Sequence, residues 1–158
     1  MNTFTKLSIF FLRIVVGWMM LYAGLTKIFN PNWSAAFYLK GAKTFPSFFN
    51  WFMQPNVLPI TNLLNEWGLT ILGISLILGV FVRLTSIYGM ILMLLYYLPI
   101  LDFPYPNPHA FIVDEHIIYA SILLFFIAIN AGRIWGLGSW FSNLSIYSKV
   151  PKLKNWVS

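Results

Sequence analysis

The chain lacks cysteine and has few charged residues, since Asp, Glu, Lys and Arg make up 9% of its 158 residues. The absence of cysteine excludes disulfide scaffolds, thiol nucleophiles, iron–sulfur centres and thiol-relay redox sites. Soluble domains carry about 25% charged residues, so the low charge also excludes an ordinary water-soluble domain. Hydrophobic residues make up 59% of the chain. This composition predicts a small integral membrane protein.

Four apolar segments are long enough, or nearly so, to cross a bilayer as helices of about 20 residues. They cover residues 7–28, 63–82, 85–101 and 112–131. We therefore predict an all-α fold, an integral membrane four-helix bundle, within a domain of residues 1–138. Residues 139–158 combine aromatic side chains with three lysines, which is typical of an interfacial tail at an anionic inner leaflet.

The charged residues divide unevenly between the two sides that four spans would create. One side has no acid and seven basic residues: Lys6, Arg13, Arg83, Arg133, Lys149, Lys152 and Lys154. The other side has three lysines and all four acids: Glu66, Asp102, Asp114 and Glu115. The positive-inside rule then predicts a protein of the cell (plasma or inner) membrane with both termini in the cytoplasm. We expect no binding of nucleic acid, which needs a basic patch on a soluble face.

The loop between the first two predicted spans, residues 30–62, is rich in aromatic residues and contains four prolines. Two short interfacial helices are predicted here, Ser34–Lys40 and Pro46–Gln54, because Gly41 and Pro55 follow them. One interpretation is an aromatic belt that anchors the protein in the interface. The other is a cover over an outward-facing pocket for a flat apolar ligand.

Polar and small residues recur along one face of the first predicted span, at steps of three or four residues: Arg13, Gly17, Met20, Gly24 and Lys27. Charges at bilayer depth tend to face the interior of a bundle, and small residues let another helix approach closely. We therefore assign structural roles to five residues: Arg13, Gly17, Gly24, Gly73 and Arg83. The alternative is that Arg13 and Lys27 extend to opposite interfaces.

Three ionisable residues are the candidates for chemistry. Glu66 is placed at the same end of the bundle as Lys27, and an ion pair between them is predicted because a buried unpaired charge is costly. His116 lies one turn inside the fourth predicted helix, level with both, and imidazole exchanges protons near neutral pH. The alternative is that these residues only clamp the helices together.

Metal and haem sites are not expected. His109 and His116, with Asp114 and Glu115, could in principle bind zinc or iron, but their pattern is not specific. Two acids at a helix start are also explained by the helix dipole. A haem with two histidine ligands would need a second histidine inside the membrane.

Several short motifs resemble those of DoxX-type membrane proteins, from Arg13 to about Leu137. They are RIVVGWMMLYAGLTK at 13–27, Glu66-Trp67-Gly68 through Gly79 and Arg83, His116-x-x-Tyr119, and Asn130-Ala131-Gly132-Arg133. The long tryptophan-containing loop resembles the DoxD branch, the small membrane subunit of thiosulfate:quinone oxidoreductase. This resemblance implies a partner subunit facing outward and a quinone as electron acceptor. The chain has Gly138 where relatives often have an aspartate.

The leading hypothesis is a membrane subunit of a redox complex with a quinone-type pocket at the outer mouth of the bundle. The candidate catalytic residues are Lys27, Glu66 and His116, and the residues expected to pack on the quinone are Trp33, Trp51, Trp67 and Tyr119. The subunit is not expected to be catalytic alone, because no residue stores electrons. The alternative is a non-catalytic membrane anchor or assembly subunit. A transporter is disfavoured because no continuous polar path crosses the predicted bundle.

Overall fold

The fold is all-α in the computed structural model, which describes residues 1–138. Its elements are α1 (Thr3–Ile28), α2 (Ala36–Leu39), α3 (Pro46–Phe52), α4 (Leu58–Leu78), α5 (Val82–Ile100), α6 (Glu115–Ile129) and the short 3₁₀ helix η1 (Ala131–Arg133). By length and composition α1, α4 and α5 can each cross a membrane, and α6 is a shorter apolar helix. The prediction of an all-α membrane protein with short helices between the first two spans is confirmed. The predicted tail at 139–158 lies outside the described residues.

Helix boundaries differ from the predicted ones where local chemistry decides them. The second long helix begins at Leu58 rather than at 63, because Pro59 occupies its first turn, where no backbone N–H donor is needed. The fourth begins at Glu115 rather than at 112, because Asp114 caps it through its side chain. Gly79 ends α4 in the left-handed conformation, with φ of 71°.

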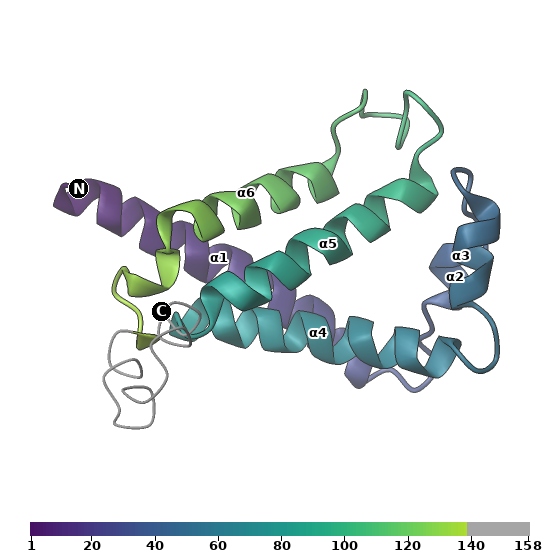
Figure 1. The fold of residues 1–158 in the computed structure, drawn as a ribbon, viewed down its shortest axis with the longest axis horizontal. Helices are drawn as coiled ribbons and strands as arrows, with labels where there is room; N and C mark the ends of the chain where they lie inside the picture. Colours follow the sequence, from purple (N-terminus) through teal and green to yellow (C-terminus); the bar gives the residue numbers. More distant parts are fainter. Residues whose placement is uncertain (139–158) are drawn as a thin grey trace.

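The helices form two pairs, α1 against α4 and α5 against α6. Consecutive helices α4 and α5 meet at the turn around Gly79 and diverge from there (Figure 1). The N-terminus, this turn and η1 lie at one end of the molecule, which we call the η1 end (Figure 1, left). The short helices α2 and α3 and the loop 101–114 lie at the other, the α3 end. The outward faces of the long helices are apolar and suit contact with lipid.

Glycines allow α1 and α4 to approach closely. A Cβ atom at Gly24 would lie 2.6 Å from the backbone nitrogen of Thr70, and one at Gly73 would lie 2.4 Å from the backbone nitrogen of Leu21. A Cβ at Gly17 would lie 2.9 Å from the Leu76 Cβ. Backbone atoms cannot give way as a flexible side chain can, so these contacts depend on the absence of a side chain.

We expect Gly73→Ala to destabilise the protein by about 1–3 kcal/mol, because the added methyl overpacks the α1–α4 contact. The direction of the change in stability is informative. In an isolated helix alanine is more favourable than glycine by about 1 kcal/mol, so without the close contact this substitution would stabilise the protein. Thermal unfolding in detergent measures the change. Gly41→Ala is the matched control, because a Cβ there meets nothing within 4 Å. A Gly73→Ala protein as stable as the native one would contradict the close contact.

The η1 end is held together by Arg13, whose side chain is fully buried. Its Nη1 donates to the carbonyl oxygens of Ala131 at 2.6 Å and Ile134 at 2.9 Å, and its Nη2 donates to Trp135 at 3.4 Å. These carbonyls follow the end of α6, where carbonyl groups carry partial negative charge. The alternative that Arg13 extends to the interface is therefore wrong.

The segment after η1 is also fastened to the end of α4. The backbone N–H groups of Leu137 and Gly138 donate to the carbonyls of Leu78 and Gly79, at 2.9 and 3.1 Å. A Cβ at Gly79 would lie 2.9 Å from Nη1 of Arg13. Arg83 lies in the first turn of α5 and is partly exposed. The η1 end is thus a tightly closed junction of α1, α4 and the chain after α6.

Candidate functional site

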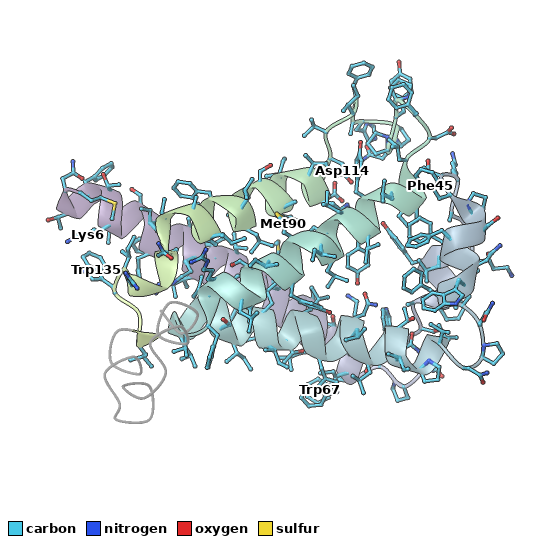
Figure 2. All side chains as sticks on the ribbon, viewed as in Figure 1. Lys6, Phe45, Trp67, Met90, Asp114 and Trp135 are labelled. Carbon is cyan, nitrogen blue, oxygen red and sulfur yellow. The ribbon has the colours of Figure 1, made fainter. Side chains whose placement is uncertain are left out.

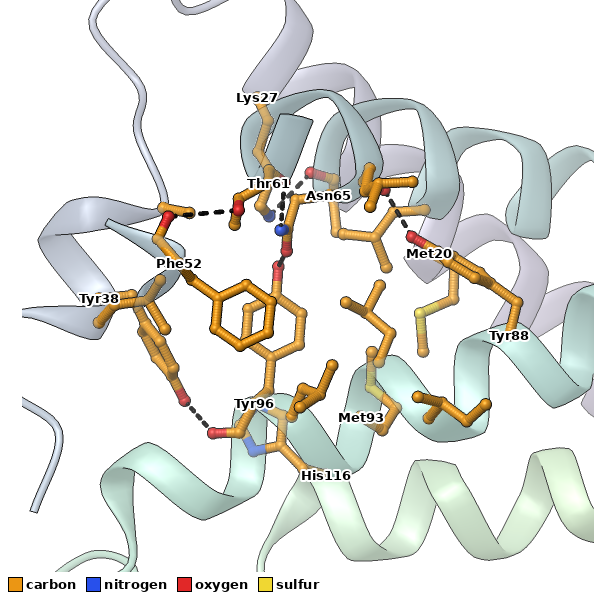
Figure 3. A pocket seen from close by; sticks show the side chains of 18 of the residues that line it. Met20, Lys27, Tyr38, Phe52, Thr61, Asn65, Tyr88, Met93, Tyr96 and His116 are labelled. Carbon is orange, nitrogen blue, oxygen red and sulfur yellow. Dashed lines mark hydrogen bonds between the residues drawn. The ribbon is translucent and has the colours of Figure 1, made fainter. Parts of the chain in front are cut away.

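A cavity of about 440 Å³ lies where α4 and α5 diverge, toward the α3 end. All four long helices and the segment containing α2 and α3 contribute to its walls (Figure 3). The deeper walls are apolar, with Met20, Leu69, Leu92 and Met93 among the lining residues. Both its size and its apolar lining are typical of small-molecule sites, which span about 300–1,000 Å³.

Helices α2 and α3 cover the cavity because their buried side chains pack together and onto α5. Phe49 is 1% exposed and clusters with Ala35 and Leu39, and Leu95 of α5 packs against this cluster. The backbone N–H of Ala35 donates to the Asn62 side chain at 2.9 Å. This cover is therefore attached to both α4 and α5.

Tyr38 of α2 makes a further tie between the cover and α5. Its hydroxyl donates to the Tyr96 carbonyl at 2.6 Å (Figure 3). Burial raises the pKa of the Tyr38 phenol, and the nearby carboxylates of Asp114 and Glu115 raise it further. The phenol therefore stays neutral and keeps its proton for this hydrogen bond.

Tyrosine and asparagine side chains place polar atoms in the apolar walls. The Tyr96 hydroxyl donates to the Asn65 side-chain oxygen at 2.6 Å, and the Asn65 amide donates to the Thr61 carbonyl at 2.7 Å. The Tyr88 hydroxyl donates to the Leu64 carbonyl at 2.6 Å. Figure 3 shows Tyr88 and Tyr96 approaching α4 from opposite sides of the cavity. Both tyrosines thus join α5 to α4 across the region where the helices separate.

His116 brings an acid–imidazole pair to the cavity wall. Asp114 is 3% exposed, and its Oδ2 lies 2.7 Å from His116 Nδ1. Its Oδ1 accepts the backbone N–H groups of His116 at 3.0 Å and Ile117 at 3.3 Å, which caps α6. With Nδ1–H donating to the carboxylate, Nε2 is the nitrogen that accepts a proton. The His116 ring also lies against Tyr96, with ring centroids 5.6 Å apart.

Lys27 lines the cavity near the cover, but the predicted ion pair with Glu66 is wrong. Its Nζ donates to the Ala23 carbonyl at 3.1 Å and lies 5.5 Å from the Trp33 ring centroid. Among the described residues no ion pair joins Lys27 to Glu66. Neighbours on a helix differ by about 100° in direction, so with Asn65 facing the cavity the next side chain, Glu66, turns away. Glu66 is not among the lining residues.

The four aromatic residues expected at the ligand separate into two groups. Trp33 and Tyr119 line the cavity. Trp51 and Trp67 do not, and each is 51% exposed. Figure 2 shows Trp67 pointing away from the other helices. The prediction that Trp51 and Trp67 pack on a ligand in this cavity is therefore wrong, because both side chains lie on the outer surface.

Sequence reasoning missed seven polar or aromatic contributors to the walls: Tyr38, Phe49, Phe52, Thr61, Asn65, Tyr88 and Tyr96. Asn65 was detectable, because it follows Thr61 by four residues inside an apolar segment and precedes Glu66 directly. The rule that polar residues in spans face the interior applies to it equally. Tyr96 had no such signal, since tyrosine is common at membrane interfaces.

A group of metal-ligand side chains coincides with the start of α6. Ligand atoms of Asp114, Glu115 and His116 lie within 4.8 Å of one another. Both carboxylate oxygens of Asp114 already accept hydrogen bonds from the helix start and from the imidazole. Capping of α6 accounts for this arrangement.

In a comparison with protein families, the family described as DoxX matches residues 8–100. The matched segment runs from α1 to the end of α5 and includes most of the residues around the cavity. Searches against curated proteins and against solved structures give no match.

Proposed function

The chain belongs to the DoxX family, and on this premise we propose that it is a four-span subunit of a redox complex that binds a quinone-type ring. The ring would occupy the cavity at the α3 end, between the two helix pairs. The observation that carries the proposal is the Asp114–His116 pair at the wall of a mostly apolar, aromatic-covered cavity.

For the topology, we propose that α6 is the fourth span and that both termini are cytoplasmic. The basic residues Lys6, Arg13, Arg83 and Arg133 lie at the η1 end, and the acids Asp102, Asp114 and Glu115 lie at the α3 end. This division supports an outward-facing α3 end by the positive-inside rule. The cavity and its cover would then lie toward the extracytoplasmic side of the cell membrane.

The residues present fit a quinone in size and chemistry. The cavity volume suits a ring system, and Trp33, Phe52 and Tyr96 provide flat apolar surfaces. A quinone supplies electron acceptance when bound, and its two carbonyl oxygens accept hydrogen bonds. His116 would hold a proton at Nε2, with Asp114 stabilising the imidazolium, and Lys27 would offer an ammonium donor.

Electron supply would come from another subunit, because the chain has no cysteine and no residue that stores electrons. We propose an outward-facing partner, as in the DoxD branch of thiosulfate:quinone oxidoreductase. The long aromatic segment between α1 and α4 supports this assignment.

Titration of the detergent-purified protein with decylubiquinone tests the proposal. We expect saturable quenching of tryptophan fluorescence with one site per chain, because Trp33 lines the cavity. Glu66→Gln serves as the control and should bind with unchanged affinity, since Glu66 is not at the cavity. Non-saturable quenching that matches partition into detergent alone would contradict the proposal.

A second candidate is an assembly subunit, supported by the outer face of the cover. Phe45, Phe48 and Trp51 are between 50% and 63% exposed there, and exposed aromatic groups are typical of membrane interfaces and protein contacts. In this case Trp51→Ala would release a co-purifying partner without changing quinone binding.

A further inference from the structure

Two residues that line the cavity are also exposed on the outer surface of the helices. Leu64 of α4 is 49% exposed and Ile91 of α5 is 51% exposed. Both belong to helices of membrane-spanning length, so their outer surfaces face lipid hydrocarbon. The cavity therefore reaches the molecular surface between α4 and α5, within the membrane.

The opening has defined edges. Toward the η1 end it is closed by Tyr88, whose hydroxyl binds the Leu64 carbonyl and whose ring lies against Gly68. Toward the α3 end it is closed by the Tyr96–Asn65 hydrogen bond. Tyr88 and Tyr96 are separated by eight positions on α5, or about 12 Å along the helix axis, and Ile91 lies between them. We call this opening, bounded by Leu64, Tyr88, Ile91 and Tyr96, the lateral window.

The other end of the cavity is covered. Helices α2 and α3 are fastened over it by the Tyr38–Tyr96 and Ala35–Asn62 hydrogen bonds and by buried Phe49. A ligand from water would have to displace this cover, whereas a ligand from the bilayer meets the exposed apolar side chains of Leu64 and Ile91 at the window. A cavity of about 440 Å³ holds a ring system, and a long aliphatic tail has to extend out of it.

We propose that the ligand is a membrane-dissolved ring compound with a long aliphatic tail. Its ring enters the cavity sideways through the lateral window, and its tail remains in the window. The tail lies in the gap between Leu64 and Ile91 and continues into the surrounding lipid. Its apolar surface is never transferred to water on this route. This inference rests on the proposed function, and it adds the class of ligand and its route.

Narrowing the window tests the inference. Ile91→Trp places a larger side chain at the opening, and Leu84→Trp is the matched control. Leu84 lies two turns earlier on the same face of α5, is 50% exposed and does not line the cavity. Each variant of the full chain is reconstituted in nanodiscs, and binding is measured for decylubiquinone and for ubiquinone-0, the same ring without a long tail.

We expect Ile91→Trp to weaken decylubiquinone binding about tenfold and to change ubiquinone-0 binding less than twofold. Leu84→Trp should leave both unchanged. Unaltered decylubiquinone binding in Ile91→Trp would overturn the window while leaving the proposed function intact. Failure of the native protein to bind either compound would overturn the proposed function and, with it, this inference.

Discussion

Replacing Arg13 with methionine is expected to abolish the folded state or to destabilise it by about 3–5 kcal/mol. The guanidinium is fully buried and satisfies the carbonyl oxygens of Ala131, Ile134 and Trp135. Methionine keeps the length and apolar stem but removes the guanidinium donors: the Ala131 carbonyl keeps only the backbone N–H of Ile134, and the Ile134 and Trp135 carbonyls lose their Arg13 donor. Breaking a buried charged interaction costs several kcal/mol. Thermal unfolding in detergent, with size-exclusion chromatography of the purified variant, measures the loss.

Two further variants make the Arg13 result specific. Lys6→Met removes a cation from the exposed first turns of the same helix and should change stability by no more than about 0.5 kcal/mol. Arg13→Lys keeps the charge but has no planar fork of donors, so it should remain clearly destabilised. An Arg13→Met protein with native stability would show that the three carbonyls find other donors and that the clamp is not needed.

Replacing His116 with glutamine is expected to weaken decylubiquinone binding about 10- to 100-fold. A hydrogen bond that involves a charged group contributes about 1.5–3 kcal/mol, and every 1.4 kcal/mol is tenfold in affinity. Glutamine is uncharged and cannot form the imidazolium that Asp114 would stabilise. Fluorescence titration of the purified variant gives the affinity, and its unfolding temperature shows whether the fold is retained.

Asp114→Asn separates the two roles of this aspartate. Asparagine caps a helix about as well as aspartate, so α6 should keep its start and the protein its stability. The amide no longer stabilises a charged imidazole, so binding should weaken in the same direction as in His116→Gln. Asp102→Asn is the matched control, because Asp102 pairs with Lys43 on the exposed surface. If His116→Gln bound decylubiquinone with native affinity, the acid–imidazole pair would have no role in binding.

The helices were largely predictable because their determinants are local. The lengths of the apolar segments predicted the four long helices. The positions of Gly41, Pro46 and Pro55 predicted the short helices between the first two spans. Errors arose where one residue decides a boundary, as Pro59 and Asp114 do. Both act within one turn of the helix start, where the preferences for proline and for capping side chains determine the first helical residue.

The site was only partly predictable because it depends on how each helix is rotated about its axis. Lys27 and His116 were expected at a common end and both line the cavity. Glu66 was expected beside them, but its neighbour Asn65 occupies the inward position and bonds to Tyr96. An error of one residue on a helix changes the direction of a side chain by about 100°, and sequence spacing within one helix does not determine that rotation.

The divergence of α4 from α5 had no signal in either helix considered alone. It follows from packing: α1 lies tightly on α4 through Gly24 and Gly73, while the α2–α3 cover packs Phe49 and its neighbours against Leu95 and Leu98 of α5. Aromatic residues of the intervening segment suggested a cover but did not indicate which of them face inward. Phe49 and Phe52 do, and Trp51 between them faces outward.

Photo-crosslinking with an azido-quinone tests most directly whether the cavity between the helix pairs is a quinone site. The purified protein is irradiated with the probe, and the labelled residues are located by mass spectrometry with and without excess decylubiquinone. The account predicts competitive labelling inside the cavity, near Met20, Met93 and Tyr96. Labelling confined to the outer surface around Trp51 and Trp67, or labelling that excess decylubiquinone does not reduce, would contradict it.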